Sequence, residues 1–223
     1  GYIMKTGIEK LDEVINLDNS KLIVIASRPS MGKSTLALEI ASNIALKQDV
    51  PTLFFSLETS REKLLELIAQ KPNIAENDLN NAKLHFVDTP NLSIKGIYDK
   101  CREMKEKFNI KAVCIDYIQL IGYDKEECLS RDNEISNISN TLKNIATELD
   151  INIFALSQLS RAPENRTDHR PILTDFVNNS SIVDNADVIM FLYRDISNCD
   201  HKGTELIIAK NVNGVLKTID VSF

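Results

Sequence analysis

Gly32, Lys33 and Ser34 follow a short apolar run and open an amphipathic, helix-like stretch. A glycine at this point lets the backbone approach a phosphate group where a side chain would collide, and the first amides of a following helix would point at the anion. The lysine ammonium can reach the terminal phosphates of a nucleotide, and the serine hydroxyl can bind Mg²⁺. A strand, loop and helix that contain this tripeptide by chance are the alternative. The expected phosphate-binding residues are Ser30, Met31, Gly32, Lys33, Ser34 and Thr35.

Ser27 stands five positions before Gly32, where the usual phosphate-binding loop (P-loop) has its first glycine. Serine is small enough for the exit of a strand, provided that its φ angle stays negative. The context that the motif requires is present, because a buried apolar run precedes the loop and a helical pattern follows it. We therefore interpret the segment as a working loop despite the missing glycine.

Three further polar residues follow apolar runs, at the strand ends where α/β sheets place their ligands. Asp116 could hold Mg²⁺ through water, and Glu58 could polarise an attacking water molecule. Gln158 could sense a γ-phosphate and move the loop behind it. Each has a simpler interpretation. Asp116 could be an aspartate in a turn, Glu58 an acid at a helix start favoured by the helix dipole, and Gln158 a buried glutamine bonded to the backbone.

Short apolar runs alternate with amphipathic stretches, which predicts a mostly parallel sheet flanked by helices. After residue 193, the segments 204–210 and 216–223 flank Asn213-Gly214, a strong hairpin signal. The predicted fold is therefore α/β and doubly wound, with a C-terminal antiparallel β-hairpin, in one domain over residues 1–223. The expected strands are residues 22–26, 52–56, 84–87, 112–116, 151–156 and 187–193, and the expected helices are residues 33–47, 60–70, 93–108 and 131–149.

The composition narrows the class of protein. A net charge of −6 argues against a broad nucleic-acid-binding face but leaves DNA contacts in a few loops open. No apolar run approaches the roughly 20 residues of a membrane helix, so we expect no membrane association. The cysteines lie far apart without CxxC spacing, which suits a reduced, intracellular protein. Because the chain begins at Gly1 rather than Met, we expect a piece of a longer protein.

Several longer phrases run through the chain, among them ASRPSMGKSTLALEIA, LFFSLETSREKLLELI, CIDYIQLI and IFALSQLSRAPENRTDHRP. In these phrases, and over essentially its whole length, the sequence resembles the RecA-like motor domain of DnaB-type replicative DNA helicases. The resemblance implies that Lys33 and Ser34 bind the ATP phosphates and Mg²⁺, and that Asp116 is the second acid. It implies Glu58 as the catalytic base and Gln158 as the γ-phosphate sensor. Loops of this family commonly lack the first glycine too.

By the same resemblance, the protein is an ATP-dependent DNA helicase motor that acts in DNA replication in the cytoplasm. The implied cofactors are ATP and Mg²⁺. The implied partners are single-stranded DNA in the pore of a homo-hexamer whose active sites lie between subunits, together with a helicase loader and a primase. By the resemblance we expect a fragment that lacks the family's N-terminal helical domain.

Two departures from the family pattern bear on activity. The family's C-terminal hairpin carries a lysine and, two residues later, an arginine that reaches the neighbouring subunit's ATP. Here Lys210 is retained as a catalytic candidate, and Val212 stands at the arginine position. The DNA-facing loop, residues 176–181, lacks the family's charged pair and glycine. A further segment is either a basic DNA-contacting loop or a plain solvated one, and it contains Arg161, Arg166, His169 and Arg170.

These departures leave an alternative function open, a divergent paralogue that binds ATP and assembles or binds a replication partner but unwinds poorly. A third class, a RecA-like recombinase or a clock-type ATPase, shares the expected fold but not the phrases RPSMGK and SQLSR.

Overall fold

The computed structural model describes residues 4–18, 20–71, 83–122, 131–176, 180–195 and 203–222. These residues form an eight-stranded sheet with the strand order β3-β2-β4-β5-β1-β6-β7-β8. The first six strands run parallel, and β7 and β8 add to the edge of the sheet as an antiparallel hairpin. The strands are β1 (Leu22–Ser27), β2 (Thr52–Ser56), β3 (Leu84–Val87), β4 (Ala112–Asp116), β5 (Asn152–Gln158), β6 (Val188–Arg194), β7 (Thr204–Asn211) and β8 (Lys217–Val221).

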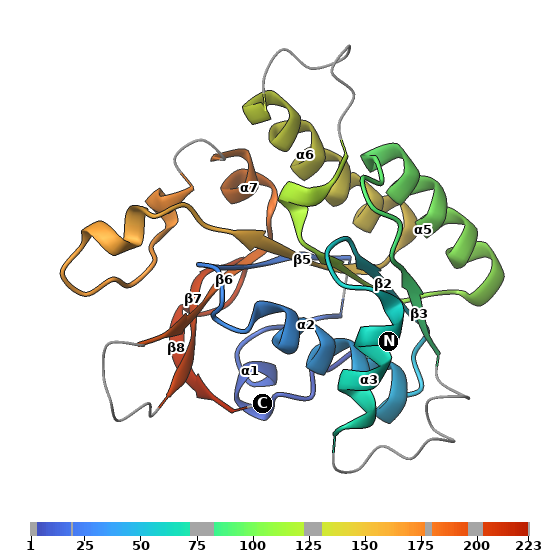
Figure 1. Ribbon diagram of the computed structural model, residues 1–223, viewed down its shortest axis with the longest axis horizontal. Helices are drawn as coiled ribbons and strands as arrows, with labels where there is room; N and C mark the ends of the chain where they lie inside the picture. The colour runs from blue at the N-terminus through green and yellow to red at the C-terminus, as the bar shows by residue number, and fades with distance from the viewer. Residues whose placement is uncertain are drawn as a thin grey trace.

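Helices cover both faces of this sheet (Figure 1). In the view of Figure 1, α5, α6 and α7 lie above the sheet, and α1, α2 and α3 lie below it. The helices are α1 (Glu9–Asp12), α2 (Lys33–Ser42), α3 (Arg61–Ala69), α5 (Ile94–Phe108), α6 (Arg131–Leu149) and α7 (Ser180–Asn185). The predicted fold class and the eight predicted strand segments are confirmed, with bounds that differ by at most two residues.

Successive side chains along each strand point to opposite faces of the sheet, and this divides the core into two apolar layers. In β1, Leu22 and Val24 face the layer beneath α5, α6 and α7, whereas Ile23 and Ile25 face the layer that contains α2. The central strands are buried along their whole length, because helices cover both faces. This alternation decides which side chains at the strand ends can face α2.

The helix predicted over residues 33–47 is interrupted. α2 ends at Ser42, and a π-helical turn, η1 (Asn43–Lys47), continues it. Asn43 is buried there, and its side-chain amide donates a 3.0 Å hydrogen bond to the carbonyl of Thr6. This contact with the N-terminal segment is not visible in the local pattern. Ser60 and Ser93 cap α3 and α5, since their hydroxyls accept hydrogen bonds from the amides of Lys63 and Gly96.

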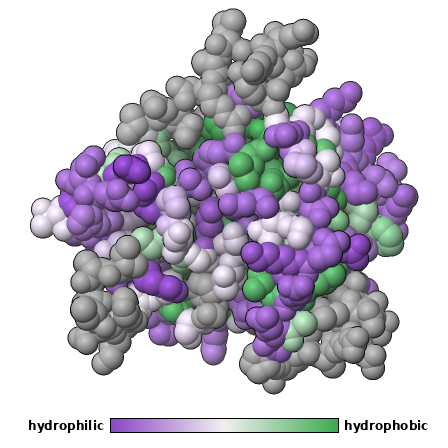
Figure 2. All heavy atoms as spheres, in the orientation of Figure 1, coloured by the Kyte–Doolittle hydropathy of each residue, from purple (hydrophilic) through white to green (hydrophobic). Residues whose placement is uncertain are grey.

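Residues 160–175, called here the projecting loop, leave the end of β5 and contain two short turns, η3 (Ala162–Asn165) and η4 (Leu173–Asp175). Hydrophilic side chains cover this region at the left of Figure 2. Arg166 donates two hydrogen bonds, of 2.8 and 2.7 Å, to the buried carboxylate of Asp175. Arg170 pairs with Glu205 of β7 at 2.7 Å. Two of the four basic residues in this loop are therefore paired with carboxylates of the same chain, which favours a structural role for them.

Asp175→Asn is predicted to lower the free energy of unfolding by about 1–3 kcal/mol, the scale of hydrogen bonds to a charged group. Burial raises the pKa of Asp175, but hydrogen bonds from Arg166 and the Ile172 amide outweigh it and hold the pKa below 3.8. A depressed carboxyl pKa stabilises the fold above that value, and this stabilisation is lost as the pH falls below it. Urea unfolding at neutral and at acid pH measures both effects.

The matched control is Asp168→Asn, an exposed acid in the same loop, which should change stability by less than about 0.5 kcal/mol. Equal stability of the Asp175 variant and this control at neutral pH would show that the Arg166–Asp175 pair does not hold the loop.

Candidate nucleotide-binding site

The loop between β1 and α2 has the conformation that its glycine allows. Gly32 caps α2 with a left-handed φ of 92°, and Ser30 is also left-handed, with a φ of 65°. The helix begins at Lys33, and the Leu36 amide donates a 3.0 Å hydrogen bond to the Gly32 carbonyl. The first amides of a helix have no partner inside the helix, so those of α2 are free to bind an anion.

The backbone at Ser27 does not need the left-handed conformation that would require a glycine. Ser27 is the last residue of β1, so its backbone is extended, and its side chain is fully buried. The missing glycine therefore introduces no left-handed strain at this position.

The ends of four neighbouring strands point polar side chains to one face. Ser27, Ser56, Asp116 and Gln158 each end a strand, and the apolar residues two positions earlier belong to the layer that contains α2. Because side chains alternate along a strand, all four face the side of α2 and the P-loop. The sequence predicted the clustering of Asp116 and Gln158 and placed Ser27 at the exit of a strand, but it did not single out Ser56, which resembles an ordinary strand residue.

Asp116 is the most unusual of these groups. The residue is 1% exposed, and neither carboxylate oxygen has a hydrogen-bond partner within 3.5 Å among the described residues, although the Ser34 hydroxyl lies close enough to act on its pKa as a donor. Burial raises its pKa, the nearby Ser34 hydroxyl and Lys33 ammonium lower it, and the charge of Glu58 raises it, with a net upward shift. An unpartnered buried carboxylate beside a hydroxyl and a phosphate-binding loop has the chemistry to hold a cation.

No cluster of three or more His, Cys, Asp or Glu side chains suited to a metal occurs in the described part of the chain. A metal at Asp116 would therefore need other oxygen ligands. Mg²⁺ fits this requirement, since it is commonly bound by one or two carboxylates together with substrate phosphates and water.

The ammonium of Lys33 lies over an aromatic ring that sequence reasoning did not single out. Its Nζ is 4.4 Å from the centre of the Tyr117 ring, and the residue is 8% exposed. Burial and the charges of Glu58 and Asp116 raise the pKa of Tyr117, so these groups share one environment. The only local signal was an aromatic residue directly after the strand-end acid.

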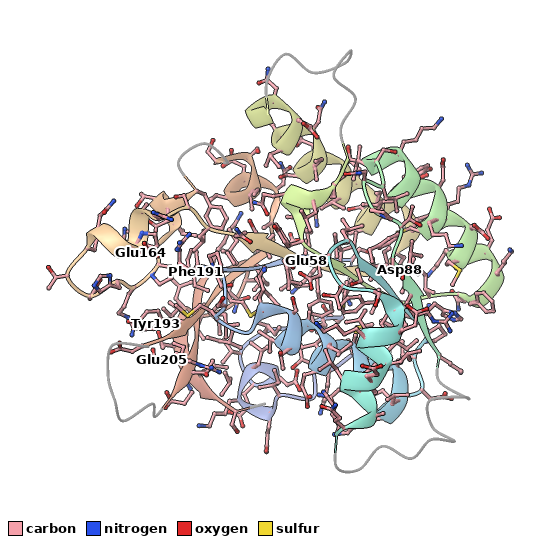
Figure 3. All side chains as sticks on the ribbon, in the orientation of Figure 1. Glu58, Asp88, Glu164, Phe191, Tyr193 and Glu205 are labelled. Carbon is pink, nitrogen blue, oxygen red and sulfur yellow. The ribbon has the colours of Figure 1, made fainter. Side chains whose placement is uncertain are left out.

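Glu58 lies on the loop between β2 and α3, near the centre of Figure 3. Its side chain is exposed, and its charge raises the pKa of Asp116 and Tyr117. An exposed carboxylate beside the buried site can accept a proton from a water molecule that enters from solvent.

Gln158, at the end of β5, is held by a neighbour that the sequence did not reveal. The Gln158 backbone amide donates a 3.0 Å hydrogen bond to the side-chain oxygen of Gln119. The Gln119 side-chain nitrogen donates in turn to the Ser157 hydroxyl at 2.9 Å. The segment after β4 thus fixes the end of β5.

Arg28 joins the P-loop to the projecting loop. Its guanidinium donates to the Leu159 carbonyl at 2.8 Å and pairs with Glu164 at 2.9 Å. Glu164 is labelled on the projecting loop in Figure 3. Only the three-dimensional arrangement identifies this contact, because the two residues are 136 positions apart.

Lys210 and Val212 lie far from the P-loop of their own chain. Lys210 pairs with Ile189 near the start of β6, at the level of Val24 in β1, whereas the P-loop follows Ser27. The offset is about 10 Å along the strand direction, and Val212 lies farther in the same direction. The Lys210 ammonium donates to the Val183 carbonyl of α7 at 2.6 Å, and Val212 is 43% exposed. Lys210 therefore contacts α7, and the Val212 amide donates to the Asp187 carbonyl just after α7.

The predicted DNA-facing loop is described only at its ends. Phe176 is buried, and residues 180 and 181 begin α7, while residues 177–179 lie outside the described residues.

The geometry has counterparts among known proteins. The family model of the DnaB-like helicase C terminal domain matches residues 3–85 and 68–223. The chain belongs to this family. A curated relative, the replicative DNA helicase DnaB of Leifsonia xyli subsp. xyli (strain CTCB07), is 38% identical over 98% of this chain and 53% of its own length.

Two solved structures share the fold. The first, an isolated ATPase domain, superposes with a TM-score of 0.87 at 32% identity, over 99% of this chain and 87% of that one. The second, a DnaB-like replicative helicase described with its interactions with primase, gives a TM-score of 0.89 at 32% identity, over 99% of this chain and 61% of that one. The resemblance to the DnaB-type motor domain and the RecA-like fold are thereby confirmed.

The DnaB-like chain spans about half the length of the curated relatives that it matches. Membership of this family implies that the site binds a nucleotide. No helix in the described residues is both long and apolar enough to span a membrane.

Proposed function

We propose that residues 1–223 form an ATPase motor domain that binds ATP with Mg²⁺ and hydrolyses it to translocate on single-stranded DNA and unwind duplex DNA during replication. The observation that carries this proposal is the unpartnered, 1% exposed carboxylate of Asp116 beside Ser34 and the P-loop. A buried charge of this kind is costly unless a cation joins it.

Each residue of the site would have a separate task. The backbone of residues 30–35 and the Lys33 ammonium would bind the phosphates, and Ser34 and Asp116 would hold Mg²⁺, which neutralises phosphate charge when bound. Glu58 would accept the proton of the attacking water. Gln158 would contact the γ-phosphate from the end of β5.

The proposed assembly is a homo-hexamer around single-stranded DNA in the cytoplasm. The position of Lys210 supports an active site between subunits, because the hairpin lies too far from the P-loop of its own chain to reach it. The structure of a DnaB-like helicase described with primase supports a primase as partner, and we propose a helicase loader by analogy.

A second candidate is a divergent paralogue that binds ATP and assembles but unwinds poorly. Val212 in place of an arginine favours it, because a missing arginine finger can lower hydrolysis by orders of magnitude. DNA-stimulated ATP hydrolysis of the full-length protein, measured together with its molecular mass in solution, distinguishes the two candidates. Assembly and ATP binding without DNA-stimulated turnover would support the paralogue.

Lys33→Ala is predicted to abolish nucleotide binding or hydrolysis while the fold is kept, because the ammonium would contact phosphates. The test measures binding of a fluorescent ATP analogue and the rate of ATP hydrolysis. Lys47→Ala, a lysine at the end of the same helical segment, is the matched control and should behave as the wild type. Unchanged hydrolysis by a folded Lys33 variant would refute the assignment of the P-loop.

Glu58→Gln should preserve ATP binding and reduce turnover roughly a hundredfold or more, the scale of a lost general base. The amide keeps the size of the side chain but cannot accept the proton. Glu62→Gln, an exposed acid in the first turn of α3, controls for the loss of one charge nearby. Wild-type turnover in the Glu58 variant would show that Glu58 is not the general base and is only an acid near a helix start.

Val212→Arg should raise ATP hydrolysis about tenfold, because a guanidinium would meet charge that develops on the neighbour's γ-phosphate. Lys210 already supplies one cation, so we expect less than the full effect of an arginine finger. The measurement is ATPase rate against protein concentration, with Val215→Arg, at an exposed valine of the same hairpin, as control. The gain should occur only in the assembled protein, and a gain in monomers would contradict action between subunits.

A further inference from the structure

The hydroxyl of Ser27 is buried at the base of the P-loop without a partner. The residue is 0% exposed, and its Oγ has no hydrogen bond to any residue that the structure describes. Buried hydroxyls nearly always find a partner, because leaving one unpaired destabilises the fold. The hydroxyl under the phosphate loop is therefore available to form a bond in another state of the site.

Gln158 is the neighbour best placed to form that bond. Ser27 and Gln158 are register partners at the ends of the parallel strands β1 and β5. Both side chains face α2, because Ile25 and Leu156, two positions earlier in the same strands, belong to the apolar layer that contains α2. Side chains on the same face of adjacent strands stand about 4.8 Å apart, well within reach of a glutamine amide.

The chemistry of a phosphate decides how this pair would be arranged. Phosphate oxygens only accept hydrogen bonds, so a glutamine that contacts the γ-phosphate must present its side-chain nitrogen to it. The side-chain oxygen then needs a donor from elsewhere, and a serine hydroxyl can donate. A glycine at position 27, as in the usual motif, could not.

We propose that Ser27 is a positioning residue for Gln158. When ATP is bound, the Ser27 hydroxyl donates to the Gln158 side-chain oxygen and holds the amide with its nitrogen toward the γ-phosphate. The serine thus adds a contact where the usual loop has a glycine. This inference rests on the proposed function of the site as an ATP site.

The first test compares thermal unfolding of the full-length protein without nucleotide, with ADP and with a non-hydrolysable ATP analogue. Ser27→Ala should not lower the midpoint without nucleotide, because the hydroxyl is unpaired in that state. It should weaken binding of the ATP analogue about three- to tenfold, the scale of one hydrogen bond, and leave ADP binding unchanged. The midpoint shift with the analogue should shrink accordingly.

The matched control is Ser42→Ala. Ser42 lies at the end of α2 and is the other serine in the described residues whose buried hydroxyl has no partner. Its loss should leave both nucleotide responses as in the wild type. A fall in the nucleotide-free midpoint that is larger for the Ser27 variant than for this control would assign Ser27 a purely structural role and overturn the proposal.

The second test places Ser27→Ala in a Gln158→Ala background. The double variant should bind the ATP analogue as the Gln158 variant does, because the partner is already gone. An undiminished effect of Ser27→Ala in that background, or equal losses for ADP and the ATP analogue, would overturn the pairing. If the Lys33→Ala variant binds ATP as tightly as the wild type, the proposed function is refuted, and the inference with it.

Discussion

The buried carboxylate of Asp116 constrains the rest of the fold. A one-residue slip of β4 would turn this group into the apolar layer beneath α5 and α6, where no cation could reach it. The register Ser56↔Asp116 with β2 and the alternation of apolar residues along β4 exclude that slip. The strands therefore have to pair in a register that places their polar end residues on the same face of the sheet, the face covered by α2. The same register sets Ser27 and Gln158 side by side and brings the Lys33 ammonium to Tyr117.

Much of this arrangement could be predicted from sequence because it follows from local pattern. Apolar runs predicted the strands, and polar residues directly after them predicted the positions of Asp116, Glu58 and Gln158 at one edge. The remaining contacts are non-local. Arg28 meets Glu164 across 136 residues, and the bonds of Gln119 to the end of β5 span 38 and 39. Such pairs depend on side-chain direction after the strands have assembled, which periodicity does not encode. The π-helical turn at Asn43 is hidden for the same reason, because its side chain binds the distant Thr6 carbonyl.

Strand direction separates the hairpin residues Lys210 and Val212 from the P-loop of the same chain. Because β7 runs antiparallel to β6, the chain carries Lys210 and Val212 away from the edge that holds the P-loop. A cation on this hairpin can meet a nucleotide only if a second subunit presents one. Lys210 already donates to the Val183 carbonyl near the end of α7. In the proposed assembly, reaching a neighbour's phosphate would break that bond and free the end of a six-residue helix, which would tie the position of α7 to the same ammonium group.

A continuous series of contacts links the phosphate loop to this hairpin. Arg28 binds Leu159, just before the projecting loop, and Glu164 within it, and Arg170 in the second half of that loop pairs with Glu205 on β7. The pair of Arg166 with Asp175 joins two points within the loop. Contiguity alone does not establish coupling, which requires an element with two arrangements that both sites bias. The projecting loop lies between the two sites, because it begins two residues after Gln158 and forms ion pairs with Arg28 and with Glu205. If Gln158 contacts the γ-phosphate as proposed, loss of that phosphate would act at the start of the same segment that Arg28 holds from the P-loop.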